Sequence, residues 1–160
     1  MSRQRIHLGD IVQGDEPFLL QVYASTRLDE VAVTGWNPAQ INAFLAQQFA
    51  AQHAHYQTHY AGAQFSVIMD GETAIGRLYV ARWPREIRIV DIALLPQHRG
   101  CGVGARLIEE IQAEGRVSGR PVSIHVERMN PALRLYERLG FRETEDKGVY
   151  LLLTWTPGAP

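Results

Sequence analysis

The sequence predicts an α/β (α+β) fold in which helices flank a mixed, mostly antiparallel central sheet that contains one parallel strand pair. The stretch 88–113 reads as a buried strand, a glycine-rich turn and an amphipathic helix in succession. A second apolar strand follows at 122–126, and a strand-helix-strand crossover of this length joins parallel neighbours through a right-handed connection. Turn signals at Asp70-Gly71 and Lys147-Gly148 join the flanking strands as antiparallel hairpins.

The length and composition indicate one domain with an ordinary core. We expect residues 1–156 to form a single domain and residues 157–160 to be a disordered tail. A formal net charge of −1 provides no general attraction for nucleic acid or an anionic membrane, so neither is expected as a partner. Cys101 has no second cysteine to bridge, and the chain has no apolar secretory core at its start and no run of the roughly 18 apolar residues that span a bilayer. These features predict a cytoplasmic location.

The N-terminal part of the sequence predicts a short edge strand and two helices. Alternating Ile6 and Leu8 favour a strand within 3–10. Acidic residues and Pro17 favour a helix from about 15 to about 30, followed by a loop over 31–37. Asn37 and Pro38 then provide an N-cap and a first-turn proline for a second helix that runs to about 57.

The remaining sequence predicts six further strands and two further helices. Gly140 stops the second of these helices, and Pro96 ends the central strand. The expected strands are 63–69, 73–83, 88–95, 122–126, 141–145 and 149–155, and the helices follow Gly104 and span 131–139.

The glycine-rich turn between the central strand and its helix is a candidate anion site. The first amides of a helix lack intrahelical partners, and the helix dipole adds partial positive charge, so a phosphate or diphosphate is the expected guest. The turn has no Lys-Ser or Lys-Thr after its glycines, which excludes the nucleoside-triphosphate loop. Gly100, Gly102 and Ala105 fit a dinucleotide fingerprint loosely, but Glu127 lies too near the following short helix to serve as that motif's ribose-binding acid.

Two sequence blocks resemble the GNAT superfamily of N-acetyltransferases. The segment 99–104, RGCGVG, fits the R/Q-x-x-G-x-G/A loop by which that superfamily holds the diphosphate of acetyl-coenzyme A, and 97–102 fits in a second register. The segment 130–141, NPALRLYERLGF, resembles the later N…A…LYE-x-x-GF helix of the superfamily at about the expected distance downstream. The resemblance is close over about 65–153.

The resemblance implies an acyl-coenzyme A N-acyltransferase fold, in which the strands 88–95 and 122–126 diverge at their C-terminal ends and admit the pantetheine arm. It implies acetyl-coenzyme A as a co-substrate and no metal. Main-chain groups of the central strand are expected to pair with the pantetheine amides, and the loop amides to bind the diphosphate. The residues expected to contact the coenzyme are Ala93, Leu94, Leu95, Arg99, Gly100, Gly102, Val103, Gly104, Ala105, Asn130 and Tyr136.

Acetylation of an amine requires a proton donor for the departing thiolate and a base for the nucleophile. By the resemblance Tyr136 is the candidate acid; the alternative is an aromatic core residue that uses its hydroxyl as a polar handle. Asp91 is our candidate base because a carboxylate in an apolar strand needs a partner or a task; the alternatives are a structural ion pair and Glu127 as the base. Cys101 occupies a variable position of the loop, so we favour direct attack over a covalent cysteine route.

The acceptor is expected to bind among residues of the first two helices. Candidate substrate-binding residues are Tyr23, Arg27, Trp36 and Tyr56, with Asp29, Glu30 and Gln52 as further wall residues. The histidines at 53, 55 and 59 are expected to be solvated, packed or part of this wall rather than metal ligands. The sequence therefore predicts an N-acetyltransferase that acts on a primary amine of a small molecule or peptide, with a non-catalytic acyl-coenzyme A-binding regulatory module as the alternative. The sequence leaves the oligomeric state undecided, and a homodimer is possible.

Overall fold

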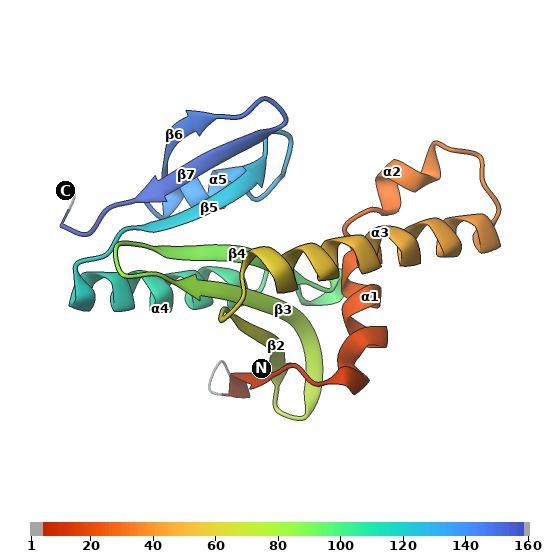
Figure 1. The fold of residues 1–160 in the computed structure, drawn as a ribbon, viewed down its shortest axis with the longest axis horizontal. Helices are drawn as coiled ribbons and strands as arrows, with labels where there is room; N and C mark the ends of the chain where they lie inside the picture. The colour runs from red at the N-terminus through yellow and green to blue at the C-terminus, as the bar shows by residue number, and fades with distance from the viewer. Residues whose placement is uncertain (1–4, 159–160) are drawn as a thin grey trace. The chain divides into compact units, whose positions relative to one another are not determined.

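The computed structural model describes residues 5–158 and contains the predicted strands and helices in the predicted order. Figure 1 shows the sheet with its flanking helices. The elements are β1 (Ile6–Asp10), η2 (Gln13–Asp15), α1 (Glu16–Ser25), α2 (Leu28–Ala32), α3 (Pro38–His59), β2 (Gln64–Asp70), β3 (Thr73–Arg82), β4 (Ile87–Leu94), η3 (Pro96–His98), α4 (Val103–Ser118), β5 (Val122–Glu127), α5 (Leu133–Arg138), β6 (Arg142–Asp146) and β7 (Tyr150–Trp155).

Residues 5–158 form a seven-stranded sheet in the order β1-β2-β3-β4-β5-β7-β6. Strands β4 and β5 are parallel, whereas β1 with β2, β5 with β7 and β6 with β7 are antiparallel. The predicted mixed sheet with one parallel pair is thereby confirmed. The parallel pairing follows from the crossover through α4, which returns the chain to the same end of the sheet.

The chain divides into two compact units that are described in turn. One contains residues 5–78 and 93–99, and the other contains residues 79–92 and 100–158. The predicted single domain over 1–156 stays a prediction. Of the predicted tail, Pro157 and Gly158 form a turn, and residues 159–160 lie outside the described residues, as do residues 3–4 of the predicted first strand.

The first unit has an apolar core between helices α1 and α3 and the sheet. The buried residues at its centre are Leu19, Tyr23, Val31, Leu45, Phe49 and Val67. The predicted start of α3 is confirmed: Asn37 is the N-cap, its Oδ1 accepts from the Gln40 amide at 2.8 Å, and the Gln40 side chain accepts from the Asn37 amide at 3.0 Å. These paired bonds satisfy two amides that have no intrahelical partner.

The predicted first helix to about residue 30 is wrong in its end point. Helix α1 ends at Ser25, and a separate helix, α2, covers the last residues of the predicted helix and the first two of the predicted loop. The Ser25 hydroxyl donates to Val22 O and the Thr26 hydroxyl donates to Tyr23 O, both at 2.7 Å. Such side-chain bonds compete with the backbone ladder, so the helix stops here.

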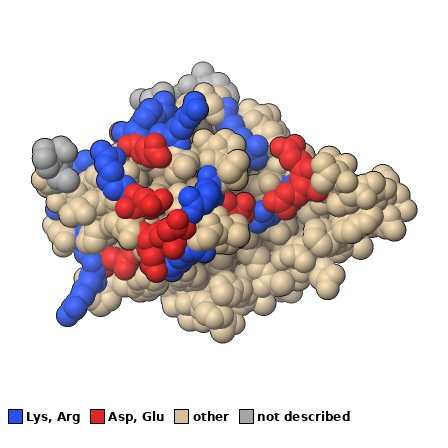
Figure 2. All heavy atoms as spheres, turned by 90° about the horizontal axis from the view of Figure 1, so that it is seen from above, with Lys and Arg blue, Asp and Glu red and all other residues tan. Residues whose placement is uncertain are grey.

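Helix α3 carries an unusually uncharged surface. The sequence from Val31 to Met69 contains no Lys, Arg, Asp or Glu. In Figure 2 the right-hand end of the view, where α3 begins, accordingly shows neither blue nor red. None of the helices within residues 5–158 combines the length and apolar character needed to cross a membrane.

The second unit packs α4 and α5 on one face of β5 and β7. The Gln112 side chain of α4 donates to Leu139 O, at the end of α5, at 2.8 Å. A Cβ built at Gly115 would meet the side chains of Trp155 and Val122 at 3.1 and 3.3 Å. Helix α4 therefore lies against the face of β5 on which Val122 points.

Gly76 in β3 lies close against the backbone at the end of β4. A Cβ at this position would lie 2.3 Å from Ala93 O and 3.0 Å from Leu94 Cα. We expect Gly76→Ala to lower the free energy of unfolding by about 1–3 kcal/mol, because two strands must move apart. Urea denaturation measures this, with Gly9→Ala as the control because nothing lies within 4 Å of its Cβ. Equal stability of the two variants would contradict the close packing.

Candidate active site

The parallel strands β4 and β5 separate part of the way along their length. Their register pairs Ile87 with Val122, Arg88 with Ser123 and Ile89 with Ile124, and the pairing ends there. Beyond that point β5 stays paired with β7 through Glu127, while Val90 to Ile92 of β4 are only half-buried. Figure 1 shows the two strands diverging toward their C-terminal ends. The predicted splayed pair is present, and it exposes main-chain groups inside the sheet.

The loop before α4 presents backbone amides as expected for an anion site. Gly102 is the N-cap in the left-handed region with φ +84°, and Gly100 has φ +75°, so neither position suits a residue with a side chain. The first intrahelical bond runs from the Arg106 amide to Gly102 O at 3.0 Å. The amides of 103–105 precede that bond and so lack an intrahelical acceptor. Residues 102–105 are half-exposed, which leaves them accessible.

Tyr136 and Asp91 are brought together in the second unit. Tyr136 is 5% exposed, and its ring packs edge-on against Phe141 at 6.1 Å. Burial, and then the negative charge of Asp91, raises the pKa of the Tyr136 hydroxyl to about 12. The phenol is therefore protonated throughout the physiological pH range. Asp91 is half-buried on β4, and its charge acts on the Tyr136 hydroxyl.

Asn130 organises the turn before α5. Its Oδ1 accepts from the Ala132 amide at 2.8 Å, and its carbonyl accepts from the Leu133 amide at 3.1 Å. Residues 131–132 therefore form a turn and the helix begins at Leu133, two residues later than predicted. Asn130 thus stabilises the turn that leads to Ala132, the N-cap of α5; a coenzyme contact by Asn130 stays a prediction.

In the first unit, several groups predicted to bind the coenzyme bond within the protein. The Leu95 amide donates to Ile75 O at 2.9 Å, so it is already engaged. Of the main-chain groups of Leu95, the carbonyl is therefore the one that we expect to contact pantetheine. Arg99 Nε donates to Leu94 O at 2.9 Å, and an Nη donates to Ser25 Oγ at 3.3 Å. Binding of the diphosphate by Arg99 and of pantetheine by 93–95 stay predictions.

The predicted acceptor residues occupy different environments in the first unit. Tyr23 is 5% exposed in the core, with the Arg27 guanidinium over its ring at 5.4 Å. Arg27 also donates to Glu30 at 2.9 Å. Trp36 is 40% exposed and meets Phe44 edge-on at 5.1 Å, whereas Tyr56 is half-buried farther along α3. Tyr23 and Arg27 are thus in contact with each other, whereas Trp36 lies just before the start of α3.

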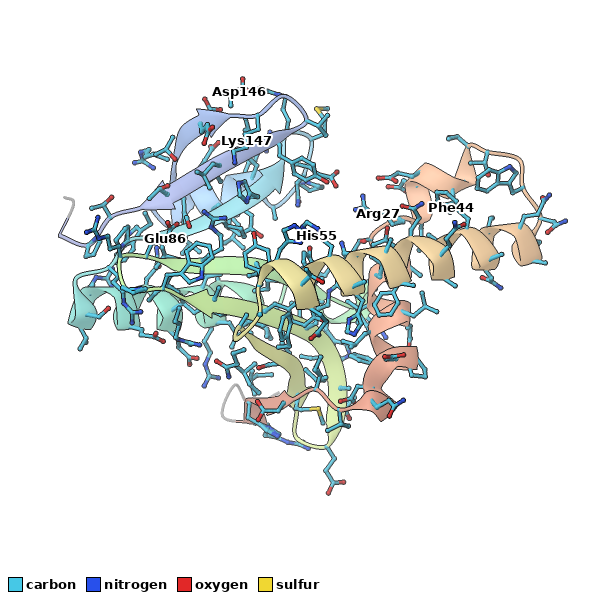
Figure 3. The ribbon with its side chains drawn as sticks, in the orientation of Figure 1. Arg27, Phe44, His55, Glu86, Asp146 and Lys147 are labelled. Atoms are coloured by element: carbon cyan, nitrogen blue, oxygen red, sulfur yellow. The ribbon has the colours of Figure 1, made fainter. Side chains whose placement is uncertain are left out.

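The histidines of α3 show no metal-like grouping. His55 and His59 stack at 4.0 Å between ring centroids, and His59 Nδ1 lies 3.1 Å from His55 O. Among residues 5–158 no three His, Cys, Asp or Glu side chains are placed to hold a metal ion. In Figure 3, Phe44 and His55 lie at separate points along α3, with Arg27 between them in this view.

The sequence reading missed a polar cluster on β4, β5 and the adjacent turns. Its members are Glu86, Arg88, Ser123, His125 and Lys147. Glu86 and Lys147, labelled in Figure 3, come from the turn before β4 and the turn between β6 and β7. The available signal was alternation: Ser123 and His125 interrupt the apolar residues 122, 124 and 126, and Arg88 interrupts Ile87 and Ile89.

The mixed sheet has one parallel pair, β4 and β5, whose strands separate, and the N-terminus of the intervening helix α4 has no side-chain cap. This arrangement defines an acyl-coenzyme A N-acyltransferase fold. The acetyltransferase (GNAT) domain model matches residues 61–143, just over half of the 160 residues. The chain therefore belongs to the GNAT acetyltransferase family. A comparison with curated protein sequences gave no match.

Solved structures of acetyltransferases share this fold. The PaiA N-acetyltransferase of Thermoplasma acidophilum, in complex with coenzyme A, is 15% identical with a TM-score of 0.71, covering 98% of this chain and 99% of that one. An acetyltransferase of Thermus thermophilus is 18% identical with a TM-score of 0.69 and the same coverage. A GNAT family acetyltransferase of Elizabethkingia anophelis with acetyl-coenzyme A bound is 17% identical with a TM-score of 0.60, covering 96% and 99%.

Proposed function

We propose that the protein transfers the acetyl group of acetyl-coenzyme A to a primary amine of a small molecule or peptide by direct attack. The observation that carries the proposal is the separation of β4 from β5 after the Ile89–Ile124 pair, in the same unit as the uncapped amides of α4. Membership of the acetyltransferase family supports it. The bound structures of PaiA and of the Elizabethkingia protein support coenzyme A as the carrier.

The helix α4 amides and the opened strand edge would hold the co-substrate. Acetyl-coenzyme A, when bound, supplies the acetyl group as a thioester. The amides of 103–105 point out of the helix N-terminus, where the dipole favours a diphosphate. Main-chain groups of β4 beyond Ile89 no longer pair with β5, so they suit the two amides of the pantetheine arm. This positioning turns the bimolecular attack into an oriented one.

Tyr136 would assist departure of the sulfur. The amine nitrogen attacks the thioester carbonyl carbon, a C–N bond forms, the C–S bond breaks and the sulfur departs with its electron pair. A thiol has a pKa of about 8.5, so full proton transfer from a phenol at about 12 is uphill by roughly 5 kcal/mol. We therefore assign the hydroxyl to a hydrogen bond that stabilises the thiolate as negative charge develops.

The base that takes the proton from the amine is Asp91, Glu127 or water. Asp91 lies close enough to Tyr136 to add to the rise in the pKa of that hydroxyl that burial causes. Glu127 is half-buried at the end of β5. Substitution of each carboxylate by its amide, followed by the pH profile of kcat/KM, separates the three choices: loss of the acidic limb identifies the base.

Acetyl-coenzyme A should raise the thermal midpoint of the protein. A ligand at about 100 times its Kd stabilises the native state by about 2.7 kcal/mol, which for a chain of this size corresponds to roughly 5–10 °C. Differential scanning fluorimetry measures the shift, and release of coenzyme thiol with a panel of amines measures transfer. No shift at saturating coenzyme would overturn the proposal; a shift without thiol release would instead favour a non-catalytic coenzyme-binding module.

A further inference from the structure

His125 lies on β5 one residue beyond its last pairing with β4. Val122 of β5 points toward α4, because a Cβ at Gly115 would meet it at 3.3 Å. Successive side chains of a strand point to opposite faces, so Ile124 and Val126 point the same way as Val122, and His125 points to the face away from α4. The imidazole thus stands where the strands begin to separate, within the second unit.

Two cations approach the two nitrogens of this imidazole. Arg88 Nη1 lies 3.3 Å from Nδ1, and Lys147 Nζ lies 3.1 Å from Nε2. A guanidinium and an ammonium can only donate hydrogen bonds, whereas a neutral imidazole has one acceptor nitrogen and one N–H. One ring N–H must therefore face a cation, an arrangement that lacks an acceptor.

The rigidity of Arg88 decides which nitrogen accepts. Arg88 Nε donates to Ser123 Oγ at 2.7 Å, Nη2 donates to Glu86 at 3.3 Å, and the Trp83 ring lies 5.2 Å from the guanidinium carbon. The Ser123 hydroxyl donates to the same Glu86 carboxylate. The Arg88 side chain is only 11% exposed. In the tautomer that gives this fixed donor the lone pair of Nδ1, the imidazole proton lies on Nε2.

Lys147 is by contrast an accessible donor. Its side chain is 43% exposed in the turn between β6 and β7, and its nearest carboxylate oxygen, from Glu145, is 3.9 Å away. At that distance Lys147 and Glu145 form an ion pair but no hydrogen bond. In this tautomer the Nε2–H of His125 and the Lys147 ammonium are two donors, with 3.1 Å between the nitrogens, on an accessible face.

We propose that His125 Nε2–H and the Lys147 ammonium form a subsite for an oxyanion, a carboxylate or phosphate, carried by the amine acceptor. One oxygen of such an anion would accept hydrogen bonds from both the Nε2–H and the ammonium, and so give the Nε2–H the acceptor that it lacks. The inference rests on the proposed function, because it names the substrate class of that acetyl transfer: an amine that also bears an anionic group. The coenzyme carries phosphates of the same chemistry, so the experiments separate the two sources.

The charges around His125 predict its titration. Burial, then Arg88 and Lys147, lower the pKa of the imidazole, while Glu145 and Glu86 oppose the shift. The ring is therefore neutral at pH 7 and Nε2 keeps its proton as a donor. A bound anion favours the charged imidazolium, so it must raise the pKa of His125.

NMR titration of the His125 ring in the full chain tests the subsite without catalysis. We expect the pKa of His125 to lie below 6.5 in the protein alone and to rise when acetate or inorganic phosphate is added. Lys147→Met should weaken the response to either anion, and Lys147→Arg should retain it because the charge is kept. An anion-independent pKa in the wild-type protein would overturn the proposal.

The specificity of acetyl transfer gives the second test. Loss of a charged hydrogen bond costs about 1.5–3 kcal/mol, or roughly 10- to 150-fold. Lys147→Met should lower kcat/KM by that factor for amino acids and leave their decarboxylated amines unchanged. Equal loss for both amines would overturn the proposal.

Two further measurements tell whether the anion belongs to the acceptor or to the coenzyme, and whether the anion site and the proposed acetyl transfer fail separately. Binding of acetyl-coenzyme A and of its analogue without the 3′-phosphate should be unaffected by Lys147→Met; a lower affinity confined to the phosphorylated form would assign the donors to the coenzyme and overturn the acceptor proposal. A wild-type protein that acetylates no amine, yet raises the pKa of His125 with acetate, would contradict the proposed function while retaining the anion site.

Discussion

Tyr136→Phe should lower kcat by about 100-fold or more and leave the affinity for acetyl-coenzyme A nearly unchanged. The hydroxyl acts when negative charge forms on the departing sulfur, and its loss removes a stabilisation that is absent from the ground state. Because the ring keeps its packing on Phe141, stability should change little. Steady-state kinetics with the thiol-release assay and calorimetric coenzyme titration separate the two effects.

The matched control for this change is Tyr60→Phe, which removes a hydroxyl from the end of α3 and has no role in the proposed chemistry. It should keep full activity. If Tyr136→Phe were as active as this control, Tyr136 would be an aromatic packing residue, and the departing thiolate would need no hydroxyl from α5.

Gly102→Ala should lower the affinity for acetyl-coenzyme A by at least about tenfold, since a methyl group at the N-cap blocks close approach of the diphosphate to the loop. The residue has φ +84°, so the substitution also strains the backbone. Gly119→Ala is a matched control: it caps the opposite end of α4 with φ +70°, and nothing lies within 4 Å of its Cβ.

Both glycine variants should lose roughly 1–2 kcal/mol of stability from the left-handed conformation. Only Gly102→Ala should weaken coenzyme binding, as measured by calorimetry at a temperature where both remain folded. Equal affinities in the two variants would remove the α4 N-terminus from the binding site.

The central strand, loop and helix could be predicted from sequence because their signals are local. Alternating glycines, a proline stop and a helical apolar stripe occur within one continuous stretch, and each indicates the same structure. The break between α1 and α2 was missed because Ser25 and Thr26 are compatible with a helix in composition. Their hydroxyl bonds to Val22 and Tyr23 decide the matter, and these depend on geometry.

The candidate site was predicted only where a motif covers it. Gly102 and Tyr136 lie in recognisable blocks, whereas the His125 cluster draws on residues far apart in the chain. Arg88 and Lys147 carry no local pattern that relates them to His125. Their relation follows from strand register, which places Arg88 opposite Ser123 and brings the β6–β7 turn beside β5.

Strand β6 protects the sheet from unwanted association. It ends the sheet order, all five of its residues are exposed, and four of them are charged: Arg142, Glu143, Glu145 and Asp146. Another chain that added a strand here would have to strip water from these charges and match a ladder interrupted between Glu143 and Glu145. The main-chain groups of β4 that have no partner in β5 lie between two neighbouring strands of the sheet instead of at its edge. The main-chain groups proposed to bind the coenzyme therefore lie on a different strand from the charged edge that discourages strand addition.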